Sequence, residues 1–469
     1  CLVGSTVTVP EPSFIGKTIN KMLFWRNRLI LLSDENVNMS QPGHFYNFWP
    51  KSAITYTASD NIDISCSSEF PAIIQDGVQT NSGLVLLTKT QQFLLSTDSD
   101  ILSPITAKIN ALSTYNFNAS SNPISLGTSI GFLDNAGKFS RFWEMFNILR
   151  EGEPIVIDQT KVVSKLFDKD INKISNSREN GIVFFCKKDS STLYGLRYFN
   201  TGERRVQQSW FTWELTGTIQ HHAVLDDSLY VILRNNGKDT MQKIGIKIDT
   251  DSVTSVDDKN NADATDDVTY RVHLDTTSTI SSGTYDATTD ITTFTKPNGY
   301  ESTAQLNVYD NNTTSDNIGE VGVVTVDSTN LKVPGDWSSR TVVLGYLYDM
   351  QIQLPTIYKL TQREQSSIAD THSSLVVHRV KMNFGGSGLY TTTIDRKGKP
   401  SYTETWDPPL ADDYSANTSI IEDLITQTIP TYEKNKNLTV TIKSTAPTPA
   451  TLYSMSWEGD YTPKYYQRV

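Results

Sequence analysis

The sequence predicts a mostly β protein, with a β-propeller-like body, an additional acidic β-domain and a C-terminal antiparallel, platform-like β-domain. Three observations support this fold class. Short apolar runs followed by polar turns recur through the first half of the 469-residue chain. These units are spaced by about 50 residues, a period typical of propeller blades. The chain is also rich in Thr, Ser, Asn and Tyr, a composition that suits strands and turns.

The stretch NRLILLSDENVNMS, residues 27–40, shows the repeated unit clearly. Its apolar run at 29–32 is typical of a strand that is buried on both faces. Residues 33–36 supply turn chemistry, because Asx side chains bond their own backbone and tolerate left-handed conformations. Residues 37–40 then alternate with a period of two, as a half-buried strand does. The stretch therefore predicts a β-hairpin.

Four further stretches repeat this pattern, at residues 83–96, 129–143, 181–199 and 228–246. Repetition at this period favours a β-propeller, whose blades have about four strands each. An irregular β-sandwich with accidental similarity between its hairpins is the alternative. We assign residues 17–248 to the propeller-like domain. Because the chain begins with Cys1 rather than Met, we expect a piece of a longer protein, with residues 1–16 as a linker from a missing N-terminal region.

Negative charge is concentrated in one segment. The net charge of the chain is −11, yet residues 249–336 hold 16 acidic and four basic residues and so carry −12. The run DDKNNADATDD at 257–267 is typical of a solvated, disordered linker. Beyond it, strand-like alternation between turns predicts a small acidic β-domain over 249–340, inserted or appended after the propeller-like domain. Residues 341–469 then read as the antiparallel C-terminal domain, in which 418–429 is either a short helix or a loop and strand.

The sequence offers little chemistry. Its histidines lack the spacing of a metal site, and we find no nucleophile elbow, Walker loop or dinucleotide motif. His221 and His222 are adjacent and so point to opposite faces of a strand. Three cysteines, Cys1, Cys66 and Cys186, fit buried, reduced thiols. We therefore predict no enzymatic activity, no cofactor and no metal. No signal peptide is visible, and the apolar runs are shorter than a transmembrane span.

The stretch GERRVQQSWFTW, at 202–213, mixes arginines with aromatic residues, as surfaces that stack nucleic-acid bases do. One arginine pair is a small electrostatic footprint on a chain of net charge −11. We therefore favour the alternative, in which Trp210 and Trp213 pack within a blade while Arg204 and Arg205 lie on a turn.

Four segments together carry a family resemblance. They are SFIGKTINKMLFWRNRLILLSDENVNMSQPGHFYNFWP at 13–50, NIDISCSS at 61–68, RRVQQSWFTWEL at 204–215 and LYSMSWEGDYTP at 452–463. With these segments the chain resembles the tail tubular protein B, or nozzle protein, family of short-tailed bacteriophages. The matching positions of the first segment are Asn27, Arg28, Leu29, Glu35, Asn36, Val37, Met39, Ser40, Gly43, Phe45, Asn47 and Phe48. Two departures are the absence of the family's N-terminal region and a weakly basic C-terminus, with only Lys464 and Arg468.

The resemblance implies a non-enzymatic structural protein of the virion tail, which forms the distal nozzle ring through which the genome is ejected. The implied partners are further copies of the chain in a homo-hexamer, an adaptor ring similar to tail tubular protein A, tail fibres, and passing double-stranded DNA bound without sequence specificity. A propeller-type tailspike that binds or cleaves surface glycans is the alternative.

Two sets of residues are candidates for these functions. Assembly contacts are expected at Arg379, Trp406, Trp457 and Tyr461, although each could equally belong to the core or surface of its own chain. Channel-facing carboxylates are expected at Asp257, Asp258, Asp266 and Asp267. A negative wall would repel DNA phosphates and leave few points of adhesion, whereas a solvated outer face is the competing interpretation.

Overall fold

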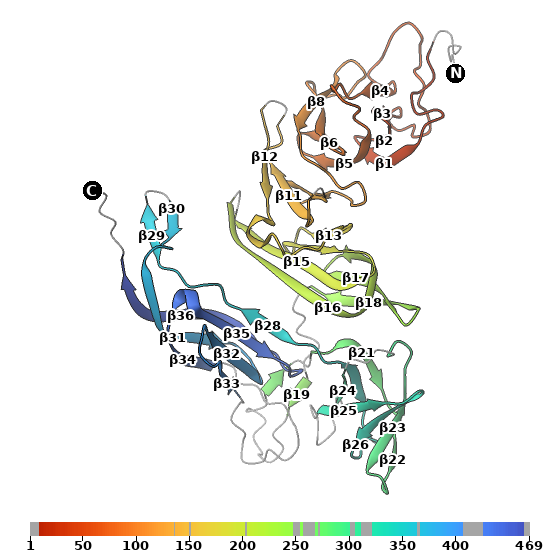
Figure 1. Ribbon diagram of the computed structural model, residues 1–469. Helices are drawn as coiled ribbons and strands as arrows, with labels where there is room; N and C mark the ends of the chain where they lie inside the picture. The colour runs from red at the N-terminus through yellow and green to blue at the C-terminus, as the bar shows by residue number, and fades with distance from the viewer. Residues whose placement is uncertain are drawn as a thin grey trace, which may run out of the picture. The chain divides into compact units, whose positions relative to one another are not determined.

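The computed structural model describes residues 9–135, 137–149, 152–201, 204–246, 254–256, 268–270, 273–300, 305–310, 321–363, 366–406 and 425–463 (Figure 1). Within these ranges the chain forms strands and two 3-10 turns, Lys161–Val163 and Asn435–Asn437, and no α-helix. The mostly β prediction is therefore confirmed. None of the described segments forms a helix that is long and apolar enough to cross a membrane. The chain divides into two compact units, Cys1–Ile248 and Asp249–Val469.

The first unit consists of four consecutive antiparallel sheets. The first sheet contains β1 (Ile19–Trp25), β2 (Arg28–Ser33), β3 (Asn36–Met39) and β4 (Ile62–Ser65). The second contains β5 (Ile74–Thr80), β6 (Gly83–Thr88), β7 (Gln92–Thr97) and β8 (Ala107–Ser113). The third contains β9 (Ile124–Ser125), β10 (Ile130–Asp134), β11 (Arg141–Phe146) and β12 (Ile155–Asp158). The fourth contains β13 (Lys173–Ser177), β14 (Ile182–Cys186), β15 (Ser190–Thr201), β16 (Arg204–Leu225), β17 (Ser228–Asn235) and β18 (Lys238–Gly245).

Strands that follow one another in the chain are neighbours in each of these sheets. The hairpin predicted at 27–40 is formed by β2 and β3, in which Ile30 pairs with Met39 and Ser33 with Asn36. Asp34 turns the chain with a φ of 50°, as the Asx-rich sequence predicts. The first strands of successive sheets also touch, β1 with β5, β5 with β9, and β9 with β13.

Alternating side chains pack each sheet against two neighbours. In β6, Leu84 and Leu86 face a core shared with the first sheet, whereas Val85 and Leu87 face a core shared with the third. All four side chains are fully buried. A strand with both faces covered needs an unbroken apolar run, which is why GLVLLT has no polar alternation. A further core joins the third and fourth sheets, where Phe142 meets Phe185 with ring centroids 4.9 Å apart.

The histidine pair in β16 is divided between two environments. His221 is exposed and His222 is buried. The Nδ1 atom of His222 lies 2.7 Å from the Oγ of Ser175 on β13. Burial, with the positive neighbours His221 and Lys173, lowers the pKa of His222 from 6.5 to about 3. His222 is therefore a neutral core residue.

The first unit should lose stability as the pH falls from 6.5 towards 3. In this window the unfolded chain binds a proton at His222 that the folded chain excludes, so acid favours unfolding. Replacement of this residue by glutamine, His222→Gln, should flatten that part of the curve of unfolding free energy against pH. The control His221→Gln alters an exposed ring and should change the slope less. An unchanged slope in His222→Gln would contradict a buried neutral imidazole.

The second unit contains a seven-stranded antiparallel sheet, in the order β21-β27-β24-β25-β26-β23-β22. Its strands are β21 (Asp275–Ile280), β22 (Thr284–Asp286), β23 (Ile291–Thr295), β24 (Leu306–Asp310), β25 (Val321–Val326), β26 (Asn330–Pro334) and β27 (Val342–Tyr346). A short pair, β19 (Thr254–Val256) and β20 (Val268–Tyr270), precedes it. The sheet includes β27, which lies beyond the predicted boundary at residue 340.

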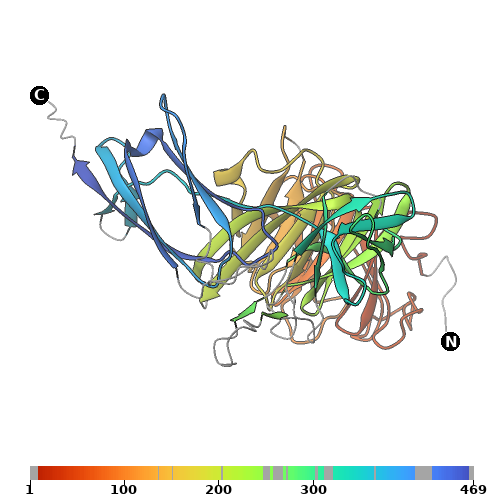
Figure 2. The ribbon, with the colours of Figure 1, turned by 90° about the horizontal axis from the view of Figure 1, so that it is seen from below.

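Two antiparallel sheets, here called the C-terminal sandwich, complete the second unit and curve around one core (blue in Figure 2). One sheet contains β28 (Met350–Gln353), β35 (Leu438–Ser444), β32 (Tyr390–Arg396) and β33 (Tyr402–Trp406). The other contains β34 (Ile425–Lys434), β31 (Ser374–Phe384) and β36 (Leu452–Thr462). A separate hairpin is formed by β29 (Leu360–Arg363) and β30 (Ser366–Ala369). Of the ambiguous segment 418–429, the described part is strand, and 418–424 lies outside the described residues.

Candidate assembly site

Arg28, at the start of β2, is a buried arginine that ties two loops to the first sheet. Its side chain is 2% exposed. The guanidinium donates to four backbone carbonyls, those of Ser40 at 2.8 Å, Asp60 at 2.6 Å, Ala58 at 2.9 Å and Leu102 at 3.3 Å. Backbone carbonyls in loops lack the regular hydrogen bonds that paired strands provide. The guanidinium of Arg28 supplies hydrogen bonds to these carbonyls instead.

The charge of Arg28 is balanced locally. Burial lowers the pKa of Arg28, and the negative charge of Asp60 opposes that shift. Burial raises the pKa of Asp60, but the hydrogen bonds to its carboxylate lower the pKa by more. The pKa of Asp60 therefore lies below its usual value. The Asp60 carboxylate accepts the backbone N–H of Lys51 at 2.9 Å and that of Thr57 at 2.6 Å. The pair is therefore an ionised hub at the base of a loop.

The loop held by this hub, residues 41–60, is here called the aromatic loop. The side chain of Tyr46 is 96% exposed and that of Ile54 is 92% exposed, and Tyr56 is also exposed. Phe45 packs edge-on against Phe24 of β1, with ring centroids 5.1 Å apart, which joins the loop to the exposed face of that strand. Large apolar side chains gathered in solvent are typical of protein contact surfaces. A loop that is held at its base by the Arg28 hub and exposes large apolar side chains is suited to binding another protein.

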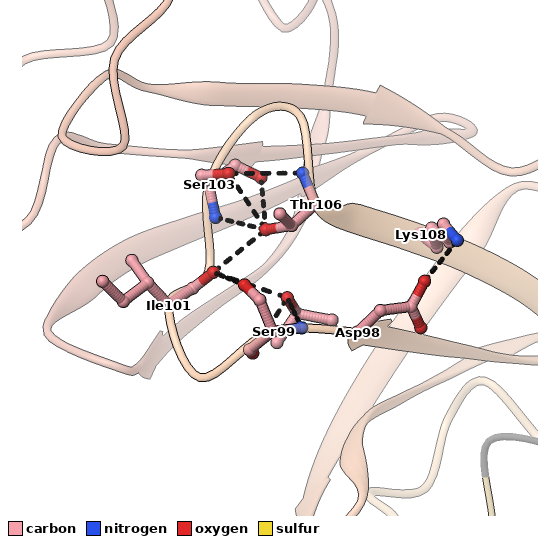
Figure 3. A network of polar contacts seen from close by, with 7 residues as sticks. Asp98, Ser99, Ile101, Ser103, Thr106 and Lys108 are labelled. Atoms are coloured by element: carbon pink, nitrogen blue, oxygen red, sulfur yellow. Dashed lines mark hydrogen bonds and ion pairs between the residues drawn. The ribbon is translucent and has the colours of Figure 1, made fainter.

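The turn between β7 and β8, residues 98–106, is fixed by the same hub through Leu102. Its hydroxyl groups bind its own backbone, and Figure 3 shows this network. Thr106 Oγ1 donates to the carbonyl of Ile101 at 3.0 Å, and Ser103 Oγ lies 2.9 Å from Thr106 Oγ1. Ile101 and Ile105 are nevertheless exposed, so this turn also presents apolar side chains to solvent.

A buried ion pair links the third and fourth sheets. Glu144 of β11 is fully buried, and Arg205 of β16 binds both of its carboxylate oxygens, at 2.7 and 2.9 Å. Ser129 and Gln159 donate to the same oxygens at 2.7 and 2.8 Å. The prediction that Arg204 and Arg205 lie on a turn is wrong, because both begin the long strand β16.

The packing of the two tryptophans in the interior agrees with that interpretation. Trp210 packs against the core between the third and fourth sheets, and Trp213 packs against the core within the fourth. Cys66 and Cys186 are buried free thiols, and burial raises the pKa of each to about 12. No group of three or more His, Cys, Asp or Glu side chains among the described residues is arranged to hold a metal ion.

Of the predicted assembly contacts, Arg379, Trp457 and Tyr461 lie on one sheet of the C-terminal sandwich and Trp406 lies on the other. Arg379 of β31 pairs across the strands with Glu458, with Nε and Oε2 3.2 Å apart, and both side chains are about half exposed or more. Trp457 lies partly buried against the sandwich core. Trp406, on the other sheet, packs beside Tyr390 with ring centroids 6.5 Å apart.

Tyr461, the fourth, belongs to a polar cluster at the end of β36. Its hydroxyl donates to Asp370 at 2.5 Å, and the ammonium of Lys359 lies 4.0 Å from the centre of its ring. Hydrogen bonds from Ser373 and Tyr461 hold the pKa of Asp370 far below its usual range. All four residues therefore have partners in their own chain. Asp257, Asp258, Asp266 and Asp267 lie outside the described residues.

Comparison with known proteins agrees with the resemblance seen in the sequence. The model of the family described as bacteriophage nozzle protein matches residues 1–468. The chain is 24% identical over 484 residues to the tail tubular protein gp12 of Escherichia phage T7, a match that covers 98% of this chain and 57% of that protein. The chain thus spans little more than half the length of this relative.

Similarity to solved structures is weak. Hsv2 of Kluyvelomyces marxianus gives a TM-score of 0.31 at 11% identity, over 66% of this chain and 82% of that one. The N-terminal domain of Nup159 gives 0.30 at 10% identity, over 93% and 92%. The family match, which spans nearly the whole sequence, is the finding that decides the assignment. The chain belongs to the bacteriophage nozzle protein family and is a structural component of the phage virion tail.

Proposed function

We propose that this chain is a subunit of the tail nozzle, a homo-hexameric ring at the far end of the tail through which the genome passes into the host. The family match over residues 1–468 is the observation that carries the proposal. Its partners would be its own copies, an adaptor ring similar to tail tubular protein A, tail fibres, and double-stranded DNA bound without sequence specificity. The family assignment favours this function over a glycan-binding or glycan-cleaving tailspike.

The proposed roles of the parts follow from their architecture. Residues 17–248 would form a propeller-like body, a proposal supported by consecutive antiparallel sheets whose first strands adjoin one another. Residues 249–340 would form the acidic β-domain near the nozzle tip, and residues 341–469 the platform-like domain. Carboxylates of the acidic segment would face the channel and repel the duplex.

The aromatic loop is the contact that we assign to the neighbouring subunit. Interfaces that persist usually bury well over 1,000 Å², with aromatic anchors near their centres. Tyr46, Ile54 and Tyr56 supply such anchors, and the Arg28 hub fixes them before binding. A surface fixed in advance loses less conformational entropy on association. Arg379, Trp406, Trp457 and Tyr461 remain candidates for further contacts.

The purified chain should assemble into hexamers, alone or with its adaptor, as read by native mass measurement. The triple variant Tyr46→Ser/Ile54→Ser/Tyr56→Ser should weaken assembly by at least about tenfold, because three apolar anchors are lost. Its fold should persist, since these side chains lie in solvent. Val162→Ser, which removes another exposed apolar side chain from the first unit, is the control. A chain that stays monomeric in the presence of its adaptor would contradict the ring proposal. Full assembly of the triple variant would show that the aromatic loop is not a contact between subunits.

A further inference from the structure

One end of the C-terminal sandwich is basic. The turn between β32 and β33 lies there beside the 3-10 turn Asn435–Asn437, and the N–H of Lys397 donates to the carbonyl of Asn437 at 2.9 Å. On a chain of net charge −11, these two turns gather five cations and two carboxylates. The cations are Arg396, Lys397, Lys399, Lys434 and Lys436, and the carboxylates are Asp395 and Glu433.

A hollow of about 310 Å³ opens between the two turns. Arg396, Lys397 and Lys436 line it, together with the polar side chains of Ser401, Asn437 and Thr439. Asp395 is its one acidic lining residue among those described. The lining therefore combines three positive charges with hydroxyl and amide donors, which is the chemistry that recognises an oxyanion.

The two carboxylates of this end are already engaged. Glu433 accepts the ammonium of Lys399 at 2.6 Å and the N–H of Lys434 at 3.0 Å, and these bonds lower its pKa to about 2. Asp395 accepts the hydroxyl of Ser401. Neither carboxylate pairs with a cation of the hollow among the described residues.

The cations of the hollow keep unused hydrogen-bonding capacity. The Nε of Arg396 is buried without a partner in the described part of the chain, and its Nη2 reaches only the carbonyl of Pro400, at 3.4 Å. The ammonium of Lys397 makes no hydrogen bond or ion pair with any described residue. Lys436 donates one bond, to the carbonyl of Thr371 at 2.7 Å, which leaves two N–H groups.

We propose that this hollow binds a phosphate group, and that in the tail its ligand is a phosphodiester of the passing DNA duplex. The inference rests on the proposed nozzle function. A guanidinium and two ammonium groups that converge from adjacent turns match the distributed charge of a phosphate. Lys397 and Lys436 are exposed, so a polymer can reach them without entering a closed cavity. Contacts to phosphate position a duplex without reading its bases, as passage of a whole genome requires.

Duplex binding by the full chain, titrated against salt, tests this proposal. Each phosphate contact contributes about −0.9 to the slope of log affinity against log salt. The variant Arg396→Gln/Lys397→Gln/Lys436→Gln should therefore flatten the slope by about 2 to 3 and weaken binding at low salt at least about tenfold. The control Lys332→Gln/Lys381→Gln/Lys443→Gln removes the same charge elsewhere in the second unit. It should leave the slope nearly unchanged.

Two further measurements keep the outcomes distinct. Native mass is recorded on the same samples, so loss of the hexamer in the unmodified chain counts against the nozzle function. If the ring is intact and the slope of log affinity against log salt is equal in both variants, the proposal for the hollow is wrong and the nozzle function is unaffected. Inorganic phosphate and vesicles of anionic phospholipid are the competing probes. Binding of either probe through these three residues, without binding of duplex, would overturn the assignment to DNA.

Discussion

Replacing Arg28 by methionine should lower the free energy of unfolding of the first unit by about 3–5 kcal/mol. Methionine fills part of the space of the arginine but donates no hydrogen bond. Four carbonyls then lose their partner, and a buried acceptor left unpaired costs about 1–3 kcal/mol. Partial access of water to the aromatic loop offsets some of this cost. Urea denaturation followed by intrinsic fluorescence measures the change.

Arg26→Met is the matched control, because Arg26 is exposed and lies over the ring of Trp25 at 5.2 Å. It should cost less than about 1 kcal/mol. Limited proteolysis gives a second readout, since the aromatic loop of Arg28→Met should be cleaved faster than that of the native chain. Equal stability of the two variants would mean that the loop is held by other contacts.

Breaking the ion pair between the third and fourth sheets should cost about as much. Arg205→Met leaves a carboxylate that is fully buried, and removal of one partner of a buried pair costs about 3–5 kcal/mol. Adding Glu144→Gln should recover at least half of that loss, because the amide carries no charge. Its oxygen can accept the N–H of Gln159, and its NH2 can donate to the hydroxyl oxygen of Ser129. The double-mutant cycle, read by thermal and urea unfolding, isolates the coupling.

The exposed pair Arg234 and Asp239 in the fourth sheet is a control for this cycle. Its side chains are about half exposed, and solvent screening leaves such exposed pairs with little net contribution to stability. Arg234→Met should therefore be nearly neutral. If Arg205→Met is equally mild, the carboxylate of Glu144 is not isolated from solvent in the way that its burial indicates.

Local sequence patterns predicted the hairpin of β2 and β3 well, because its signals come from residues that are close together in the sequence. The apolar run at 29–32 predicted burial on both faces, and in β2 Ile30, Leu31 and Leu32 are buried. The turn chemistry at 33–36 predicted the hairpin that follows. Such signals are local because side-chain alternation and turn geometry are set within a few residues.

The buried polar side chains could not be predicted in the same way. Arg28 appeared in the family pattern, but its acceptors lie 12 to 74 residues away along the chain. The sequence placed Arg205 on a turn, because its partner Glu144 is 61 residues away and no local pattern marks the pair. For the candidate site, the sequence indicated aromatic anchors in the C-terminal domain. It did not indicate the aromatic loop, because exposure of Tyr46 and Ile54 depends on the hub beneath them.

The order of strands within the sheets has a consequence for synthesis on the ribosome. In the first three sheets each strand pairs with the next to emerge, so a nascent chain can complete one sheet before the following one is made. Short sequence separation between partners also favours rapid folding. Each finished sheet, however, waits with one apolar face uncovered, as Val85 and Leu87 do until β10 arrives. The growing chain therefore exposes one apolar sheet face at a time, always that of the sheet completed last. Binding of a chaperone to this face would then depend on the rate of translation.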